Sequence, residues 1–334
     1  MIESIRNPVS IGIVGCGRFG RLHAHTLSSL AEAELVALVD SRDEVRRELA
    51  GEFPSVQVWE DLSTALAESD AEAWIVASST AAHVSNAKAI LEAGRKALVE
   101  KPLADDLAEA ERLAPLVASD SSNLMAGHIV LFNSEFRELL AELPRRGPIA
   151  YIDAVRHRPR TTIDLFPGES PFYLTMVHDL YAVAALMQGA EPQRFSAQHR
   201  VVDGNCDLAL AQLQWESGVI ASLTASFLTP PGMAPDGFDR TEVFGHGWCA
   251  RLQTNPRPIE LWDSQARWPL ALEIRDAPAS GMLAEELRLF CRVVRGLEPT
   301  PRGARYDDAI QVIRWLRQLE EAAKSQVRDT EATC

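Results

Sequence analysis

The chain has 334 residues, of which 46% are hydrophobic and 24% are charged, and its formal net charge is −14. The length allows two domains with a large core, and the composition is ordinary for a soluble globular protein. The negative charge argues against nucleic acid or an anionic membrane as a partner, and no apolar run approaches the roughly 20 residues of a membrane span.

Residues 1–8 contain no apolar stretch long enough for a signal peptide. The five cysteines form no C-x-x-C pair, which favours reduced thiols and a cytoplasmic location. We interpret Cys16 as a small filler residue rather than a redox group, and we predict no metal site.

The first predicted element is an apolar strand at residues 11–14, which ends in the G-x-G-x-x-G glycines Gly15, Gly17 and Gly20. A helical pattern follows at once. Gly15 permits a tight turn, Gly17 lets the backbone approach phosphate oxygens, and Gly20 lets the helix pack against the strand. Because the helix N-terminus would offer free N–H groups to an anion, this stretch predicts a dinucleotide site.

Strands and helices then alternate as far as about residue 126. Short apolar runs, typical of parallel strands covered on both faces, recur at 11–14, 35–39, 74–77, 97–99 and 124–126. Amphipathic helices are predicted between them at 18–30, 43–53, 62–68, 81–93 and 107–119. Repeated β–α units of this length predict a doubly wound parallel sheet of the α/β class.

Asp40 ends the second predicted strand, twenty residues after Gly20. A carboxylate at this place accepts hydrogen bonds from the adenosine ribose and repels a 2′-phosphate, which favours NAD over NADP. Arg42 lies close by in sequence and could weaken this preference, so NADP stays an alternative cofactor. The alternative role of Asp40 is to cap the next helix.

Two more polar stretches follow predicted strands, where open α/β sheets bind ligands. Ser78, Ser79 and Thr80 come after the strand at 74–77, and they either contact the cofactor or cap the next helix. Glu100-Lys101-Pro102 comes after the strand at 97–99. Lys101 would point into the crevice and donate to a substrate oxygen, and the alternative is a surface lysine.

The pattern changes after residue 127, which divides a first domain, 1–127, from a second, 128–325, with a frayed tail at 326–334. In the second domain helices are predicted at 134–143, 171–187, 283–294 and 307–324, and strands at 149–156, 194–202, 208–214, 219–227 and 241–244. Moderate alternation in these strands is typical of antiparallel strands with one covered face. Residues 229–237 are predicted to be an irregular loop.

Taken together, these residues resemble the Gfo/Idh/MocA oxidoreductase family over nearly the whole chain. The matching features are the segment Gly15 to His23, Asp40, His83, Leu91 to Gly94, Glu100 to Leu103, the stretch 127–133, His178-Asp179, and the segments 243–245 and 285–290. The Glu-Lys-Pro element is the most discriminating of them. The resemblance implies a Rossmann domain joined to an α+β domain with an open, mainly antiparallel sheet.

The resemblance also implies NAD(P)-dependent oxidation or reduction of a sugar-like alcohol by homodimers or homotetramers built through that sheet. Lys101 matches the active-site lysine and His178 the catalytic histidine. The implied cofactor contacts are Gly15, Gly17, Arg18, Phe19, Gly20, Asp40, Ser78, Ser79, Thr80, His83, Glu100 and Lys101. The implied substrate contacts are Lys101, His128, Arg158, Thr175 and His178.

Hydride transfer from a secondary alcohol needs a group that takes the hydroxyl proton, and histidine suits this role near neutral pH. The stretches 127–133 and 156–160 look most like members that act on nucleotide-linked amino sugars. Arg156, Arg158 and Arg160 would face one side of an extended strand. They either contact a phosphate or carboxylate of the substrate or form a solvated rim paired with acidic neighbours.

The chain departs from the family in the helix of His178. Members carry an Asp four residues before this histidine and often a second one three residues after it, where the chain has Leu174 and Tyr181. Thr175 is a candidate replacement, whereas Tyr173 would point away from His178 if the helix is regular. Three functions stay open: a sugar or nucleotide-sugar dehydrogenase, NAD-assisted glycoside cleavage, and a catalytically weak NAD-binding regulator.

Overall fold

The structure is a computed structural model that describes residues 7–230, 238–253, 257–262, 266–267 and 281–331. It divides into two compact units. The first comprises Met1–Phe132 and Glu273–Ile313, and the second comprises Asn133–Leu272 and Arg314–Cys334. The chain thus leaves the first unit near residue 133 and returns to it later, a return that the predicted linear boundaries do not include.

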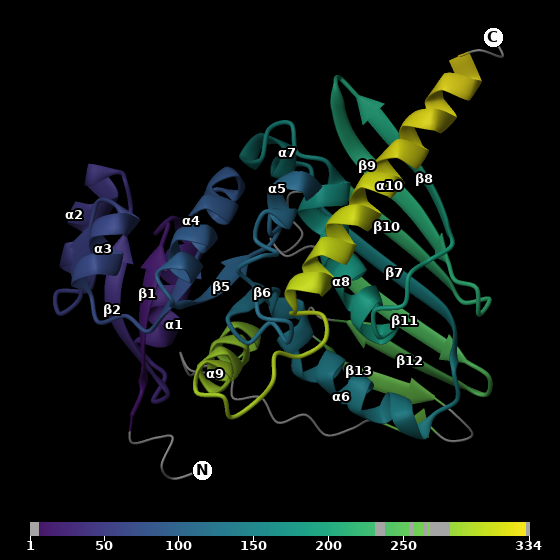
Figure 1. Cartoon of the computed structure of the whole chain (residues 1–334). Helices are drawn as coiled ribbons and strands as arrows, with labels where there is room; N and C mark the ends of the chain where they lie inside the picture. Colours follow the sequence, from purple (N-terminus) through teal and green to yellow (C-terminus); the bar gives the residue numbers. More distant parts are fainter. Residues whose placement is uncertain (1–6, 231–237, 254–256, 263–265, 268–280, 332–334) are drawn as a thin grey trace. The chain divides into compact units, whose positions relative to one another are not determined.

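The first unit is built around a six-stranded parallel sheet with the order β3-β2-β1-β4-β5-β6 (Figure 1). The strands are β1 (Val9–Val14), β2 (Ala33–Val39), β3 (Gln57–Trp59), β4 (Ala73–Val76), β5 (Lys96–Glu100) and β6 (Leu124–Gly127). The predicted doubly wound sheet is confirmed. The sequence pattern missed β3, because this edge strand has three residues and only Trp59 is buried in it. The strand order reverses between β1 and β4, which opens a crevice at the carboxyl ends of the strands.

The helices of this unit are α1 (Arg18–Leu27), α2 (Asp43–Glu52), α3 (Leu62–Glu68), α4 (Thr80–Glu92), α5 (Leu107–Glu111) and α9 (Met282–Val294), with a 3₁₀ turn at η2 (Ile129–Phe132). The helix predicted at 107–119 is too long, since α5 ends at Glu111. Pro115 follows, and proline removes a helical N–H and disfavours helical backbone at the residue before it.

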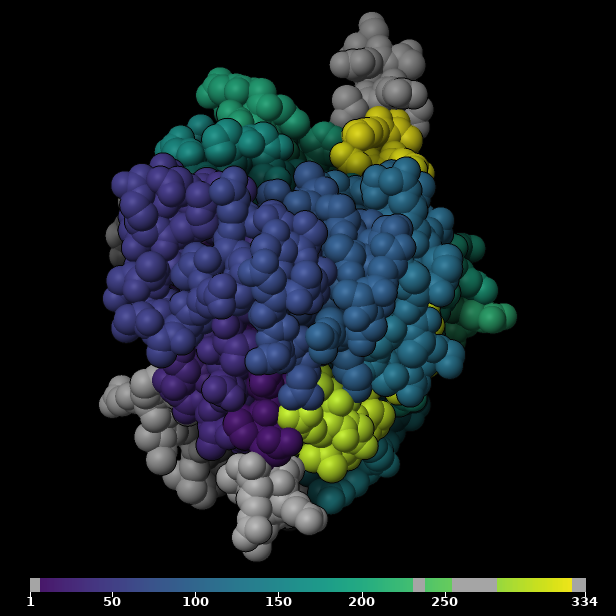
Figure 2. All heavy atoms as spheres, turned by 60° about the vertical axis from the view of Figure 1, so that its left-hand side comes forward, coloured from purple at the N-terminus to yellow at the C-terminus, as the bar shows by residue number. Residues whose placement is uncertain are grey.

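Helix α9 completes the first unit from a distant part of the sequence. Figure 2 shows the segment 281–300 in yellow-green against the purple and blue of the N-terminal residues. The Nζ atom of Lys96 in β5 donates a hydrogen bond to the Val294 carbonyl at 2.8 Å. Arg295 pairs with Glu72 just before β4. A segment predicted for the second domain therefore packs on the first sheet.

The second unit holds an eight-stranded sheet with the order β14-β13-β12-β11-β7-β10-β9-β8. Its strands are β7 (Ile149–Pro159), β8 (Arg194–Val202), β9 (Asn205–Gln214), β10 (Ile220–Thr229), β11 (Phe238–Gly245), β12 (Trp248–Gln253), β13 (Arg257–Trp262) and β14 (Ala266–Arg267). Neighbouring strands are antiparallel except β7 and β10, which run parallel. The predicted open, mainly antiparallel sheet is confirmed, and β12 to β14 were not foreseen.

Helices cover one face of this sheet: α6 (Ser134–Glu142), α8 (Val177–Leu186) and the later part of α10 (Tyr306–Glu331), as Figure 1 shows. A 3₁₀ turn, η3 (Leu143–Arg145), follows α6, and a short α-helix, α7 (Thr161–Leu165), follows β7. Alternate residues are buried along β9 and β10, so their other face is partly exposed. Helix α10 continues to Glu331, so six residues of the predicted tail are helical, and residues 231–237 of the predicted loop lie outside the described part.

A π-helical turn, η4 (Phe172–Met176), precedes α8 without a break. The single long helix predicted at 171–187 is therefore irregular at its start. Within the part of the chain that the structure describes, none of the helices has both the length and the apolar character needed to cross a bilayer.

Candidate active site

The glycine turn between β1 and α1 has the geometry that a pyrophosphate needs. Gly15 has a φ of +89°, and a Cβ atom added there would lie 2.3 Å from the backbone of Ser78. A Cβ on Gly20 would lie 2.0 Å from the Gly15 carbonyl oxygen, so the helix packs closely on the turn. A Cβ on Gly17 would meet nothing nearer than 3.9 Å, which leaves room over the backbone. Gly17 begins α1 without a side-chain cap, so the first helical N–H groups stay available to an anion.

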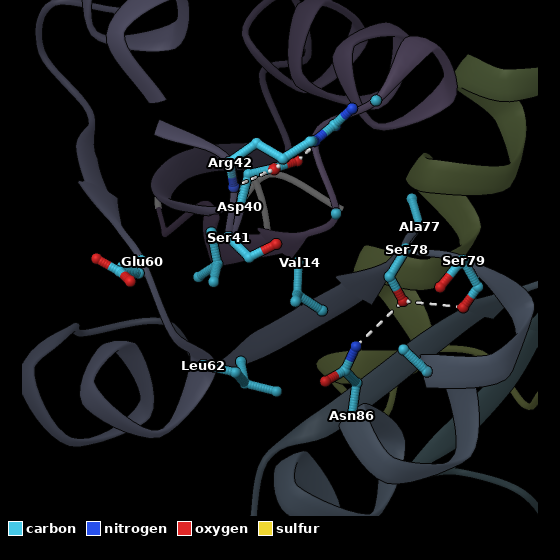
Figure 3. A pocket seen from close by; sticks show the side chains of 14 residues that line it. Val14, Asp40, Ser41, Arg42, Glu60, Leu62, Ala77, Ser78, Ser79 and Asn86 are labelled. Carbon is cyan, nitrogen blue, oxygen red and sulfur yellow. Dashed lines mark hydrogen bonds and ion pairs between the residues drawn. The ribbon is translucent and has the colours of Figure 1, made fainter. Parts of the chain in front are cut away.

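A cavity of about 570 Å³ opens at this turn (Figure 3). Five predicted cofactor residues line it: Gly15, Gly17, Asp40, Ser78 and Ser79. Its walls also include Val14, Val39, Ser41, Arg42, Glu60, Leu62, Ala77, Ala82 and Asn86, which come from β1, β2, β3, α3, β4 and α4 or their ends. Several elements thus converge on one hollow at the carboxyl ends of β1, β2 and β4.

Asp40 is buried in this cavity and fully engaged. Its Oδ2 accepts the Cys16 backbone N–H at 3.0 Å, and its Oδ1 accepts the Arg42 N–H at 3.0 Å. The Arg42 guanidinium also spans both oxygens, at 3.0 Å each (Figure 3). Burial raises the pKa of Asp40, but the hydrogen bonds from Arg42 and Cys16 outweigh it and hold this pKa below its usual value. The carboxylate is therefore charged at neutral pH, and it caps no helix, since α2 has no side-chain cap.

Cys16 is a buried spacer beside Asp40. Burial and the nearby carboxylate raise the pKa of its thiol to about 12. A thiol of this kind is protonated and unreactive at neutral pH, in line with its interpretation as a filler residue.

Ser78 and Ser79 end the wall formed by β4. The Asn86 side-chain amide donates to the Ser78 hydroxyl at 3.1 Å, as Figure 3 shows. Ser79 precedes α4 but makes no side-chain cap, and Thr80 begins the helix. The capping role that the sequence left open for Ser79 is therefore not used, which leaves its hydroxyl at the rim of the cavity.

Other predicted cofactor residues do not line this cavity. Arg18 is exposed on α1, and the ring of Phe19 packs edge-to-face on His23 at 5.1 Å. His83 is buried, with Nδ1 at 2.8 Å from the Pro102 carbonyl oxygen and Nε2 at 3.1 Å from the Ser78 carbonyl oxygen. Both nitrogens of His83 thus face backbone rather than the hollow.

Glu100 and Lys101 lie at the end of β5, the next strand of the sheet. The Glu100 carboxylate is buried, receives His23 Nε2 at 2.9 Å and accepts the Lys101 backbone N–H at 3.3 Å. Lys101 itself is half-buried. Glu100 therefore fixes the backbone from which the candidate catalytic lysine extends.

A second carboxyl group lies close to Glu100, from α9. Glu286 is fully buried, and its Oε1 accepts the His128 backbone N–H at 2.7 Å. Burial, together with the charge of Glu100, raises the pKa of Glu286 well above its usual value. This environment favours the protonated form of the acid. It holds the chain at His128, a predicted substrate residue that is itself buried.

His178 lies in the first turn of α8 and is half-buried. In the π-helical turn before it the Val177 N–H donates to the Phe172 carbonyl, five residues back. Tyr173, Leu174 and His178 are the half-buried residues of 171–180, and the others are buried. The segment before His178 is therefore not the regular helix that the prediction for Tyr173 assumed.

The predicted replacement, Thr175, is turned inward. Its side chain is buried, and its hydroxyl donates to the Pro171 carbonyl at 2.9 Å. Tyr173 donates from its hydroxyl to Glu320 Oε2 on α10 at 3.0 Å. Asp179 is buried and receives the guanidinium of Arg156, from β7 of the sheet, at 2.9 Å.

The arginines of β7 are paired with acids. Arg156 is buried between Asp179 and Asp239. Burial alone would lower the pKa of its guanidinium, but the two carboxylates outweigh burial and raise this pKa, so Arg156 stays charged. Arg158 makes two hydrogen bonds to Asp239, at 2.6 and 3.1 Å. Arg160 lies 3.9 Å from Asp207, which also binds Arg200. The arrangement matches a rim paired with acidic neighbours.

Several of these site residues were not foreseen. Glu60 and Asn86 of the cavity and Asp239 come from segments that carry no recognisable motif, and Glu286 lies in the matching segment 285–290 without a predicted role. Only the position of Glu60 directly after a strand would have signalled it, and β3 was itself missed. Lys101 belongs to the first unit and His178 to the second, so their joint action is a matter for proposal.

Comparison with known proteins gives two family matches. Residues 9–128 match a model described as an oxidoreductase family with an NAD-binding Rossmann fold. Residues 127–247 match the GFO/IDH/MocA C-terminal domain.

Individual relatives extend over almost the whole chain. A 4-carboxy-2-hydroxymuconate-6-semialdehyde dehydrogenase from Sphingobium sp. is 33% identical over 93% of this chain and 99% of its own length. A myo-inositol dehydrogenase from Streptomyces leeuwenhoekii is 26% identical over 95% of this chain and 98% of its own length.

A UDP-N-acetylglucosamine 3-dehydrogenase from Acidithiobacillus ferrooxidans is 30% identical over 64% of this chain and 66% of its own length. A solved structure of the enzyme of that name and species has a TM-score of 0.82 at 23% identity, covering 96% of this chain and 99% of that one. This structural similarity concerns the fold.

Proposed function

The chain belongs to the Gfo/Idh/MocA family of NAD-dependent oxidoreductases, and within it we propose that the chain oxidises a ring hydroxyl of a sugar-like substrate with Lys101 and His178. Named dehydrogenases of myo-inositol and UDP-N-acetylglucosamine are among its relatives, so the reaction is hydride transfer on a sugar-like alcohol or its ketone.

The observation that carries the cofactor assignment is the cavity at the glycine turn. A Cβ at Gly15 would collide with backbone, the space over Gly17 is open, and the N–H groups of α1 stay available beside it. These residues fit a pyrophosphate, with Asp40 placed for the adenosine ribose. NAD, when bound there, accepts or returns the hydride.

We assign the proton chemistry to Lys101 and His178. The Lys101 ammonium donates to the reacting oxygen and stabilises charge that develops on it. The His178 imidazole takes the hydroxyl proton on oxidation and returns it on reduction. Glu100 holds the Lys101 backbone, and Arg156 anchors the helix of His178 through Asp179.

We propose NAD rather than NADP as the cofactor. Two carboxylates, Asp40 and Glu60, border the adenosine end of the cavity and would repel a 2′-phosphate. Arg42 is committed to Asp40 by two guanidinium hydrogen bonds. Fluorescence titration should give a lower Kd for NADH than for NADPH. Tighter binding of NADPH would contradict the assignment.

We propose an uncharged polyol ring as the first candidate substrate, in preference to a nucleotide sugar. The arginines that suggested a diphosphate contact, Arg156 and Arg158, are neutralised by Asp179 and Asp239. A nucleotide sugar is the second candidate, since one relative has this activity by name. Initial rates of NADH formation with myo-inositol, simple aldoses and UDP-N-acetylglucosamine separate the two.

The same assay decides between redox chemistry and its alternatives. Net NADH formation supports the proposal. Release of a sugar without net NADH would indicate NAD-assisted glycoside cleavage instead, and NADH binding without turnover on any substrate would indicate a regulator.

We also propose that the protein forms homodimers or homotetramers through the partly exposed face of the second sheet. Leu210 of β9 and Ile220 of β10 are each 38% exposed on that face. The rings of Tyr151 and Phe244 stack on neighbouring strands with centroids 5.8 Å apart.

A further inference from the structure

His83 lies in the first turns of α4, and 2% of its surface is exposed. We propose that it is a positioning residue, which ties the loop after β4 to the loop after β5 through its two ring nitrogens. The proposal rests on the proposed function, because one loop lines the cofactor cavity and the other carries Lys101.

The geometry of the ring defines what it does. Nδ1 lies 2.8 Å from the Pro102 carbonyl oxygen, and Nε2 lies 3.1 Å from the Ser78 carbonyl oxygen. Carbonyl oxygens only accept hydrogen bonds, and an imidazole donates from both nitrogens only when each carries a proton. Each ring nitrogen therefore lies within hydrogen-bond distance of a carbonyl from a different loop.

The two carbonyls belong to the two loops that the reaction must hold in register. Ser78 follows β4 and lines the cavity, while Pro102 is bonded directly to Lys101 after β5. These strands are parallel neighbours, with Val76 opposite Val99. A displacement of about 1 Å between bound reactants can lower a rate about 100-fold, so a link between these loops bears on turnover.

A direct role of His83 at the cofactor is less well supported. The ring is not among the residues that line the cavity, and both of its nitrogens already face backbone. Its effect on cofactor and substrate would pass through the carbonyls of Ser78 and Pro102.

Two substitutions separate the two links. The side-chain amide of Asn has about the reach of Nδ1, and that of Gln has about the reach of Nε2. His83→Asn should keep the hydrogen bond to Pro102 and lose the one to Ser78, and His83→Gln should do the reverse. The exposed His246→Gln is the matched control, and unfolding midpoints report whether each variant folds.

Amide hydrogen exchange in the segments 77–80 and 100–105 is the primary measurement, since it needs no substrate. We expect His83→Gln to speed exchange about tenfold in 100–105 only, and His83→Asn to do so in 77–80 only. In parallel, His83→Gln should lower kcat with little change in the Kd of NADH, whereas His83→Asn should raise that Kd.

Equal exchange of the two variants in both segments, or exchange like that of the wild type, would overturn the proposal. Failure of the wild type to bind NADH would instead count against the proposed function, and the exchange pattern would still decide the role of His83.

Discussion

Glu100 connects three functional groups at the scale of single residues. Its buried carboxylate receives His23, accepts the N–H of Lys101 and lies close enough to Glu286 to raise the pKa of that acid. Two carboxylates in one apolar interior cannot both be charged at low cost. The structure therefore favours the protonated form of Glu286.

Replacement of Lys101 by Met should lower kcat by about 100-fold or more, because an isolated donor to a developing oxyanion contributes about that factor. NADH affinity should stay within a few-fold of the wild type in a fluorescence titration, since Lys101 does not line the cavity. Lys88→Met is the control, as Lys88 is half-exposed on α4 and pairs with Glu92. An unchanged kcat would remove Lys101 from the mechanism.

Replacement of Glu286 by Gln should flatten the pH dependence of stability. The folded protein keeps the Glu286 proton because the pKa is raised, while the unfolded chain releases it above about pH 4.5. Stability from this group is thus present at low pH and lost as pH rises, by about 1.4 kcal/mol per pH unit until the folded pKa is reached. Gln is neutral throughout and removes this slope.

Urea unfolding of the wild type and of Glu286→Gln between pH 5 and 8 measures the difference. Glu285→Gln is the matched control, because Glu285 is its neighbour on α9 and is partly exposed. The control should keep the wild-type slope. Parallel curves for all three proteins would show that Glu286 is ionised in the folded state.

Sequence reasoning found the residues of this site that belong to motifs. The spacing of Asp40 from the glycines and the position of Lys101 after a strand identify them without a structure. Glu286 and Glu60 could not be found this way. Each acquires its role from a tertiary contact with a distant segment, and no local periodicity reports such contacts.

At the scale of elements, the π-helical turn η4 is the main surprise. In this turn, just before α8, a backbone N–H donates to the carbonyl five residues earlier instead of four. π-turns of this kind are frequent at functional sites. The apolar pattern of 171–187 reads as one helix because the two helix types differ by less than one residue per turn. Local sequence therefore predicted the helix but not its π-helical start.

Replacement of Leu174 by Asp should raise kcat about tenfold on the preferred substrate, because a carboxylate beside a catalytic histidine orients its ring and stabilises its charged form. Leu174 is half-buried and lies four residues before His178, so we expect an Asp side chain there to reach the histidine. Initial rates test this expectation. Leu174→Asn, which has the same shape without the charge, should gain nothing, and an equal gain in both variants would rule out a carboxylate effect.

Replacement of Tyr173 by Phe should lower kcat several-fold while costing about 1 kcal/mol of stability, the usual net value of one hydrogen bond. Tyr173 precedes His178 in the same helical segment and donates to the carboxylate of Glu320, and we expect this contact to take over part of the missing carboxylate's role. Kinetics and urea unfolding separate the two effects. A loss of stability with unchanged kcat would make the Tyr173–Glu320 contact purely structural.

At the scale of the whole molecule, β–α alternation was enough to predict the parallel sheet and its class. The return of α9 to the first unit was not predictable, because its amphipathic pattern fits any apolar surface. The later strands of the second sheet, β12 to β14, were missed for a related reason. Pairing with β11 stabilises β12, and such pairing is invisible in a short local pattern.

We expect self-association to use the partly exposed face of the second sheet. Leu210 and Ile220 are partly exposed there, whereas their strand neighbours Ala211 and Ala221 are buried beneath the helices. An unpaired lysine at the centre of an interface is costly, so the double variant Leu210→Lys, Ile220→Lys should weaken self-association at least about tenfold, or about 1.4 kcal/mol. Sedimentation velocity at micromolar concentration measures the strength of self-association.

The control variant is Leu297→Lys, which changes an apolar residue that is 58% exposed in the first unit and should leave the oligomer intact. A monomeric wild type, or a double variant as associated as the control, would place the interface elsewhere or abolish it.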